Sequence, residues 1–317
     1  MQSIIMPSHN RSEWLDKTIA SVMKQDTHGN KIEYIVVDNN SSDNTKETVE
    51  KHIGSNPNID LRYVFEEKQG CNFARNRGIE ESCGEYIIFF DDDILLEKNC
   101  INAYIEAFKK YADAVAFGGR IKLQSPSYDL PPWLVTKGPY LRSMIVVARD
   151  LGKHDSQQDF SGYTPVTMNM AVKRSLFEKI GCFRTDLGLC GKKLIPGADY
   201  EFSLRIAEQF DSWTYTANAL VYHPIKKVQA QKSYFRKRLF GVGRVTYRLH
   251  KFESQKRIFG LPVYFLIWIA KFLCLAVKYK IVRKPVESFF YETEMILNCG
   301  CVFEHFGQKI CNKRDSR

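Results

Sequence analysis

Three consecutive aspartates, Asp91, Asp92 and Asp93, directly follow the apolar run at residues 85–90. A buried ionised carboxylate is costly unless a cation or a hydrogen-bond donor compensates it, so three of them at the end of a buried strand require positive charge. Strand alternation turns Asp91 and Asp93 to the same side, where their hard oxygen atoms can bind one divalent cation. A solvated acidic turn is the alternative, but the preceding apolar residues favour a metal site.

Two more carboxylates stand where they can do chemistry. Asp38 follows an apolar run, and it therefore shares with Asp91 a position at the carboxyl end of an expected parallel strand. Ligands bind at that edge in open α/β sheets. Asp199 opens an expected helix, where the helix dipole keeps a carboxylate ionised and available as a general base. Glu201, in the same first turn, is expected to cap the helix.

The elements that must position these acids alternate between short apolar runs and helical patterns over the first 120 residues. Such alternation is typical of an α/β fold in which crossover helices join the strands of a mostly parallel sheet. Ser12 is expected to cap the first helix, and a proline-rich stretch after residue 119 predicts a long loop. The expected strands are 3–6, 32–37, 61–65, 85–90, 168–172 and 219–222.

Sequence motifs in both halves of the chain occur in a fixed order. The first half carries SIIMPSHNR at 3–11, VVDNNSSD at 36–43, ARN at 74–76 and FDDD at 90–93. The second half carries NMA at 169–171 with GCF at 181–183, GADYE at 197–201 and VYHP at 221–224. This ordered set lies within about residues 3–245 and resembles the signatures of family-2 glycosyltransferases with a GT-A fold.

The resemblance implies a GT-A fold, an α/β fold with a Rossmann-like, mostly parallel sheet and crossover helices, to which the residues after 225 add a basic helical C-terminal segment. It implies an inverting enzyme that moves a sugar from a nucleotide-sugar, UDP-linked, to a glycan or lipid-linked acceptor in polysaccharide or glycoconjugate synthesis. A divalent cation, Mn²⁺ or Mg²⁺, would stabilise the departing diphosphate. A nucleotidyltransferase that makes a nucleotide-sugar and a non-catalytic, membrane-associated sugar-binding protein are the alternatives.

The resemblance also implies roles for individual residues. Asp199 would be the catalytic base, and Asp91, Asp93 and His223 would bind the metal. The donor-binding residues would be Pro7, His9, Arg11, Asp38, Arg75, Asp91 and Asp92. Two positions depart from the family pattern. His9 stands where the family usually has a tyrosine against the base, and Ala198 where it usually has a second acid.

The same reasoning divides the chain into three parts. Residues 1–118 would form the nucleotide-sugar-binding half, 119–225 the half that holds the acceptor and the base, and 226–317 a basic helical region. Four aromatic residues can stack on sugar rings, with packing in the core as the alternative for each. They are Trp133, Tyr140, Tyr163 and Trp213. Trp133, in the proline-rich loop, is the best candidate for stacking on a sugar ring.

The C-terminal region carries the positive charge of the chain. The net charge is +10, and residues 224–317 hold 20 basic but only 6 acidic side chains. Basic and aromatic residues alternate before the apolar segment 261–277, which only Lys271 interrupts and which is shorter than the roughly 20 residues of a membrane span. This pattern predicts binding to an anionic membrane surface and not to nucleic acid, against which the apolar segment cannot be buried. A spanning helix and a buried core helix are the alternatives.

Composition excludes several other classes of protein. The chain has 317 residues, of which 44% are hydrophobic and 26% charged, and these values exclude disordered, collagen-like, coiled-coil and multi-span membrane proteins. Nine scattered cysteines and an N-terminus without an export signal predict a cytoplasmic protein, peripherally associated with the cytoplasmic face of a membrane. The set Cys299, Cys301, His305 and Cys311 lacks the paired spacing of a zinc site, and reduced thiols are expected.

Overall fold

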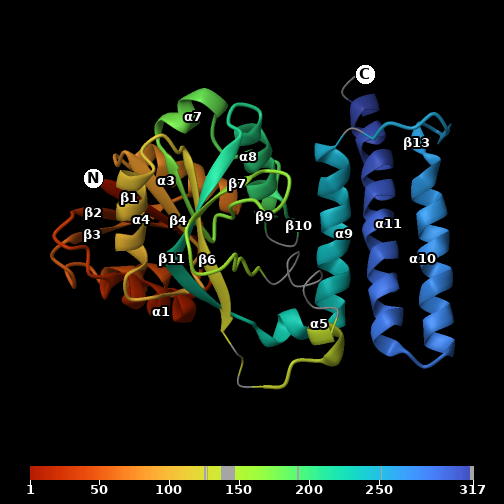
Figure 1. Ribbon diagram of the computed structural model, residues 1–317, viewed down its shortest axis with the longest axis horizontal. Coiled ribbons are helices and arrows are strands. Elements are labelled where there is room, and N and C mark those ends of the chain that lie inside the picture. Colours follow the sequence, from red (N-terminus) through yellow and green to blue (C-terminus); the bar gives the residue numbers. More distant parts are fainter. Residues whose placement is uncertain (125, 127, 137–146, 191–192, 251, 315–317) are drawn as a thin grey trace. The chain divides into compact units, whose positions relative to one another are not determined.

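The computed structural model describes residues 1–124, 126, 128–136, 147–190, 193–250 and 252–314. The chain forms two compact units (Figure 1). The sheet unit comprises Met1–Gln124, Ala148–Gly191 and Ala198–Pro224, and the helical unit comprises Ser125–Val147, Lys192–Gly197 and Ile225–Arg317. All residues predicted to bind donor or metal, or to act as the base, belong to the sheet unit.

The sheet unit is built on one large, mostly parallel sheet, which confirms the predicted fold class. Its strands are β1 (Gln2–Ser8), β2 (Ile32–Asp38), β3 (Ile59–Phe65), β4 (Tyr86–Phe90), β5 (Leu95–Leu96), β6 (Ala116–Gln124), β7 (Ser156–Asp159), β8 (Asn169–Lys173) and β11 (Ser212–Pro224). The order across the sheet is β3-β2-β1-β4-β8-β6-β11-β5, and β7 also pairs with β11. β8 lies antiparallel between β4 and β6, so that β6 and its parallel partner β11 run in the same direction as β4.

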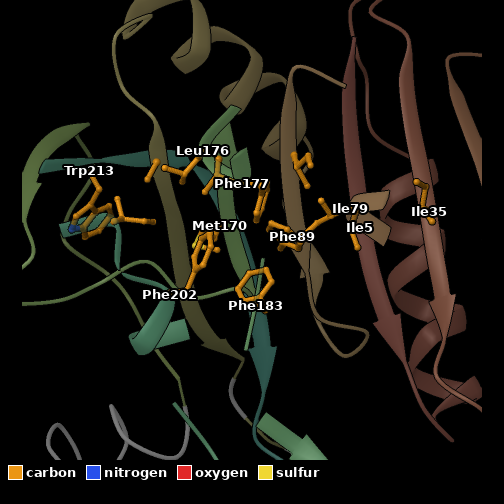
Figure 2. Packing of buried hydrophobic residues seen from close by; sticks show 14 of the residues in the cluster. Ile5, Ile35, Ile79, Phe89, Met170, Leu176, Phe177, Phe183, Phe202 and Trp213 are labelled. Atoms are coloured by element: carbon orange, nitrogen blue, oxygen red, sulfur yellow. The ribbon is translucent and has the colours of Figure 1, made fainter. Parts of the chain in front are cut away.

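The central strands are rich in apolar residues because both faces of the sheet are covered. Every residue of β2 and β4 is buried. The helices of this unit are α1 (Ser12–Met23), α2 (Thr45–Glu50), α3 (Cys71–Glu81), α4 (Cys100–Lys110), α7 (Ser175–Ile180) and α8 (Ala198–Ala207). Figure 2 shows the cluster in which Phe89 of β4 and Met170 of β8 pack with Phe183 and with Phe202 of α8. This packing fixes α8, whose first turn carries Asp199.

Two predictions made from local sequence patterns are wrong: the cap of α1 and the start of the last strand. In both cases the contact is made by a residue that is distant in sequence. Ser12 does not cap α1, which begins at Ser12 itself; the Asp43 carboxylate accepts from the Ser12 backbone N–H at 2.9 Å. The last strand is also much longer than the expected 219–222, since β11 starts at Ser212. Its first residues pair with β7, a polar strand that apolar periodicity does not reveal.

The helical unit contains three long helices that lie side by side, with α11 between the other two (Figure 1). Its elements are α5 (Pro132–Thr136), β10 (Lys193–Ile195), the 3-10 helix η1 (Lys227–Ala230), α9 (Lys232–Leu249), β12 (Arg257–Ile258), β13 (Leu261–Pro262), α10 (Val263–Ile281) and α11 (Pro285–Arg314). Gly243 of α9 and Gly300 of α11 allow these two helices to touch, because a Cβ at either position would overlap a backbone carbonyl of the other helix.

One side of α10 exposes apolar residues, among which basic residues are interspersed. Its large exposed hydrophobic residues are Leu266, Ile267, Trp268, Leu273, Val277 and Ile281. The turn between β12 and β13 adds Phe259, which is 80% exposed and has a φ of 48°, a conformation that bulky residues rarely adopt. Within the described ranges, none of the helices combines the length and the apolar character that a membrane crossing needs.

Candidate active site

The carboxyl ends of β1, β2, β4 and β11 lie along one edge of the sheet. Ser8 ends β1, Asp38 ends β2, Asp91 directly follows β4, and His223 is the next-to-last residue of β11. The topology thus brings residues from four distant segments to one edge, the edge at which open α/β sheets bind ligands.

The acidic run following β4 is held by Arg11 and Ser8. The Arg11 guanidinium Nη1 donates to Asp92 Oδ1 at 2.8 Å and to Asp93 Oδ2 at 3.1 Å. The Ser8 hydroxyl donates to Asp92 Oδ2 at 2.8 Å. The strand alternation expected for the run does not hold, because β4 ends at Phe90 and both of these aspartates lie in a turn. Arg11 therefore acts as the counter-charge of two buried carboxylates.

A second guanidinium, that of Arg75 in α3, faces two acids that are distant in sequence. Its Nη2 lies 3.4 Å from Asp91 Oδ1, and its Nη1 lies 4.0 Å from Asp199 Oδ1. Asn72 Oδ1 accepts from the same Nη1 at 3.0 Å, and the ring of Phe183 lies 5.7 Å below the guanidinium. One buried, well-braced cation therefore connects the acidic run to the first turn of α8.

The ion pairs among the described residues at this edge join two guanidiniums to four carboxylates, three of which belong to the acidic run. Burial raises the pKa of Asp91 to about 7, and the opposing charge of Arg75 does not cancel this effect. Burial likewise raises the pKa of Asp92, although Arg11 acts in the opposite direction. The site therefore has room, electrostatically, for additional positive charge.

Asp199 lies in the first turn of α8, as predicted, and about a third of its side chain is exposed. Thr167 donates its hydroxyl to Asp199 Oδ1 at 2.7 Å. The cap predicted for Glu201 is wrong. Both carboxylate oxygens of Glu201 accept from Arg205, one turn further along, at 2.9 and 3.0 Å. Glu201 is thus neutralised by an ion pair and stabilises α8 itself.

Asp38 is buried and held by two donors. The backbone N–H of Ser41 donates to its Oδ1 at 2.9 Å, and the Tyr63 hydroxyl donates to its Oδ2 at 2.8 Å. Burial, together with the Asp38 charge, raises the pKa of Tyr63, so its hydroxyl keeps the proton that it donates. Next to this pair, His9 Nδ1 lies 2.9 Å from the carbonyl oxygen of Asn39. These contacts fix the orientation of the Asp38 carboxylate.

The remaining donor and metal candidates lie at the edge but are not gathered into a metal-binding cluster. Pro7 is buried within β1, and His223 is buried near the end of β11. Among the described residues, no three His, Cys, Asp or Glu side chains surround one point as metal ligands would, and this includes the predicted set of Asp91, Asp93 and His223.

The aromatic candidates for sugar stacking have different environments. Trp133 is buried in the helical unit, with its ring 4.9 Å from one ring of α9 and 4.9 Å from one of α11, so the stacking prediction for it is wrong. Trp213 is buried in the core of the sheet unit. Tyr163 is 51% exposed, and Tyr140 lies outside the described residues.

Three residues that hold the site escaped the sequence reasoning. They are Ser8, Tyr63 and Thr167, and each donates its hydroxyl to an acid at least 25 residues away. Local patterns carry no signal for such contacts. Only the register of the parallel strands brings Tyr63 of β3 near the end of β2.

Comparisons with known proteins now add to this geometry. The chain is 24% identical over 267 residues to the glycosyltransferase AglE of Haloferax volcanii, a match that covers 84% of this chain and 80% of AglE. It is 38% identical over 91 residues to the GalNAc(5)-diNAcBac-PP-undecaprenol beta-1,3-glucosyltransferase of Campylobacter jejuni, covering 29% of each chain. Hence the match to this second relative spans less than a third of its length.

A solved structure shares the fold over nearly the whole chain. The mannosyltransferase PcManGT of Pyrobaculum calidifontis, solved with GDP-Man and Mn²⁺, has a TM-score of 0.63 and 17% identity, covering 96% of this chain and 87% of its own. The family model described as "Glycosyl transferase family 2" matches residues 3–181, more than half of the chain. The chain therefore belongs to glycosyl transferase family 2 and is a glycosyltransferase with a GT-A fold.

Proposed function

We propose that this enzyme transfers a sugar, with inversion, from a UDP-linked donor to a glycan or lipid-linked acceptor with the help of Mn²⁺ or Mg²⁺. The observation that carries the proposal is the position of Arg75, whose guanidinium faces both Asp91 and Asp199. The bond to the donor diphosphate and the attacking acceptor hydroxyl share one anomeric carbon. The acid on the diphosphate side, Asp91, and the acid on the acceptor side, Asp199, must therefore lie close together.

Asp199 is the proposed base. Within the described part of the chain its contacts with Thr167 and Arg75 both use Oδ1, which leaves Oδ2 to accept the proton of the acceptor hydroxyl. The hydroxyl oxygen attacks the anomeric carbon on the face opposite the bond to the diphosphate, and that bond breaks as the new one forms. The position of Asp199 in the first turn of α8 places its carboxylate near the positive end of the helix dipole.

The charge at the sheet edge supports a divalent cation. Among the described residues, three consecutive acids lie at this edge with Asp199 near the Arg75 that faces Asp91, and burial raises the pKa of Asp91. Asp91 and Asp93 would hold the cation, and their oxygen atoms suit Mn²⁺ or Mg²⁺, while His223 would add a nitrogen ligand. A cation bound there supplies the Lewis acid that stabilises the leaving diphosphate. The related mannosyltransferase was solved with Mn²⁺.

Asp38 is the proposed contact to the nucleotide base. Its carboxylate is fixed by Ser41 and Tyr63 and can accept from a ring N–H of uracil. Pro7, His9, Arg11 and Asp92 complete the proposed donor pocket. Because guanine also carries a ring N–H and the related mannosyltransferase binds GDP-Man, the test below compares both nucleotides.

Thermal unfolding in the presence of nucleotides tests the donor site. UDP with Mn²⁺ is expected to raise the melting temperature, since a ligand at 100 times its dissociation constant adds about 2.7 kcal/mol of stability. UDP with EDTA, or GDP with Mn²⁺, is expected to give a much smaller shift. A larger shift with GDP would overturn the choice of uracil, and diphosphate among the products of turnover would indicate a nucleotidyltransferase.

We further propose that α10 attaches the enzyme to an anionic membrane surface, where a lipid-linked acceptor would be found. The name of the Campylobacter relative includes such an acceptor, a polyprenol diphosphate. The exposed apolar residues of α10 lie among Lys271, Lys278 and Lys280, and Phe259 protrudes from the neighbouring turn. Apolar burial and attraction to acidic headgroups together support binding in the plane of the interface.

Liposome co-sedimentation tests this attachment. The double variant Ile267→Ser/Ile281→Ser removes two side chains that are 58% and 75% exposed, so it is expected to weaken binding to acidic liposomes with little effect on folding. High salt is expected to weaken the binding of the wild type to acidic liposomes without abolishing it, because salt screens charges but does not affect the burial of apolar side chains. Ile53→Ser, at a residue 53% exposed in the sheet unit, is the matched control. Equal sedimentation of all three proteins would remove α10 from the membrane contact.

A further inference from the structure

Arg149 is fixed beside β6 in the acceptor half of the sheet unit. Its backbone N–H donates to the Ile121 carbonyl at 3.0 Å, and its own carbonyl accepts from the Ile121 N–H at 2.7 Å. These two hydrogen bonds form an antiparallel β-bridge between Arg149 and Ile121 of β6. The position of the side chain is therefore set by the sheet and not by a free loop.

The guanidinium of Arg149 has no acidic partner within the described residues. Among the described residues, its Nε is buried without a hydrogen bond, and its Nη1 donates to the carbonyl of Ala148 alone, at 3.0 Å. Arg120, on the adjacent strand, differs in this respect, because its guanidinium makes a two-pronged ion pair with Asp150 at 2.8 and 2.9 Å. Arg149 is thus a partly buried cation most of whose donors are not used within the described residues.

Tyr163 and Asp199 are the neighbours of Arg149 that indicate its function. The ring of Tyr163 covers its guanidinium at 4.9 Å, and that tyrosine is half exposed. The negative charge of Asp199, beyond ion-pair distance, acts on the same guanidinium. Burial lowers the pKa of Arg149, and the nearby Tyr163 and Asp199 oppose this change. An arginine guanidinium stays charged in proteins. The unused donors therefore belong to the surroundings of the proposed base.

We propose that Arg149 and Tyr163 form an acceptor subsite in which the guanidinium binds an anionic group of the acceptor sugar and the tyrosine ring contacts the sugar. A planar guanidinium matches the oxygen pairs of a carboxylate or a phosphate, and aromatic rings pack on the apolar faces of sugars. Uronic acids and sugar phosphates both supply this chemistry. The inference rests on the proposed function only in taking Asp199 as the residue that faces the acceptor.

The proposal is tested by the binding of three small sugars to the full chain, measured by calorimetry or by ligand-observed NMR. The probes are glucuronate, glucose 1-phosphate and neutral glucose. Wild-type protein is expected to bind at least one anionic probe about tenfold more tightly than glucose, the effect of one hydrogen bond to a charged group. The anion that is preferred identifies the source of the charge.

Variants separate a binding role from a structural one. Arg149→Gln is expected to abolish the preference for the anion without changing glucose binding, and Arg149→Lys is expected to retain part of it. Arg120→Gln, which loses a cation that is already paired, is expected to keep the full preference. Tyr163→Ala is expected to weaken binding of all three sugars. The proposal would be overturned if the wild type showed no preference for anionic sugars, or if Arg149→Gln kept that preference unchanged. If Arg149→Gln does not fold, Arg149→Lys takes its place, and a full preference in that variant would overturn the proposal.

A parallel measurement keeps this result apart from the donor site. The same proteins are titrated with UDP and Mn²⁺, which report on Asp38 and the acidic run and not on Arg149. Loss of the anion preference with intact UDP binding supports the subsite. If the wild type prefers anionic sugars but binds no nucleotide, the acceptor subsite is supported and the proposed donor chemistry is wrong.

Discussion

The variant Asp199→Asn is expected to transfer sugar about two to four orders of magnitude more slowly than the wild type, which is the usual effect of removing a general base. Asparagine keeps the shape of the side chain and still accepts from Thr167, but its amide cannot take the proton of the acceptor hydroxyl. Binding of UDP with Mn²⁺ is expected to remain near wild type, because Arg75 and the acidic run are unchanged. The measurements are steady-state turnover and calorimetric UDP affinity.

Glu201→Gln is the matched control, because Glu201 lies in the same helical turn but is paired with Arg205. Its loss is expected to lower the melting temperature of the protein while turnover per folded molecule stays within a few-fold of the wild type. Wild-type turnover in Asp199→Asn would remove Asp199 from the mechanism. Equal losses of turnover in both variants would indicate that only the integrity of α8 matters.

The variant Asp93→Ala is expected to reduce the affinity for UDP in Mn²⁺ to the value that the wild type shows in EDTA. Loss of a residue that only orients a metal ligand typically costs about 10–100-fold in metal affinity, so loss of a ligand itself is expected to cost about a hundredfold or more. The fold is expected to survive, because Arg11 keeps its hydrogen bond to Asp92, and Ser8 still donates to that carboxylate.

Asp150→Asn serves as the control for this second variant, since Asp150 also pairs with an arginine but lies outside the donor site. UDP affinity in both metal and EDTA is measured by calorimetry for all three proteins. A metal-dependent affinity in Asp93→Ala equal to that of the wild type would exclude Asp93 as a ligand. A loss of similar size in Asp150→Asn would show that the assay reports general destabilisation.

Much of the sheet could be predicted because its buried parallel strands are rich in apolar residues. Every residue of β2 and β4 is buried, and the acids at their ends lie on one edge as expected. Family motifs supplied the roles of those acids. What periodicity could not supply was the partner of each acid, because Arg75 reaches Asp199 across more than a hundred residues of sequence.

The errors have a common physical origin. Ser12 and Glu201 have the local positions of helix caps, but Asp43 and Arg205 made stronger contacts available in the folded chain. Local rules describe what a residue does when it has no better partner. Trp133 was misread because a proline-rich loop has no period from which its burial could be inferred.

The position of β8 also affects how the protein is made. This strand follows β4 by many residues in sequence but pairs with it along its whole length, so during synthesis the five buried residues of β4 remain an open apolar edge until Lys173 has been added. Such an edge favours association between nascent chains. For the same reason residues 1–118 and 119–225 cannot be exchanged by recombination as separate modules, because the later segment carries β8, which pairs with β4 of the earlier one.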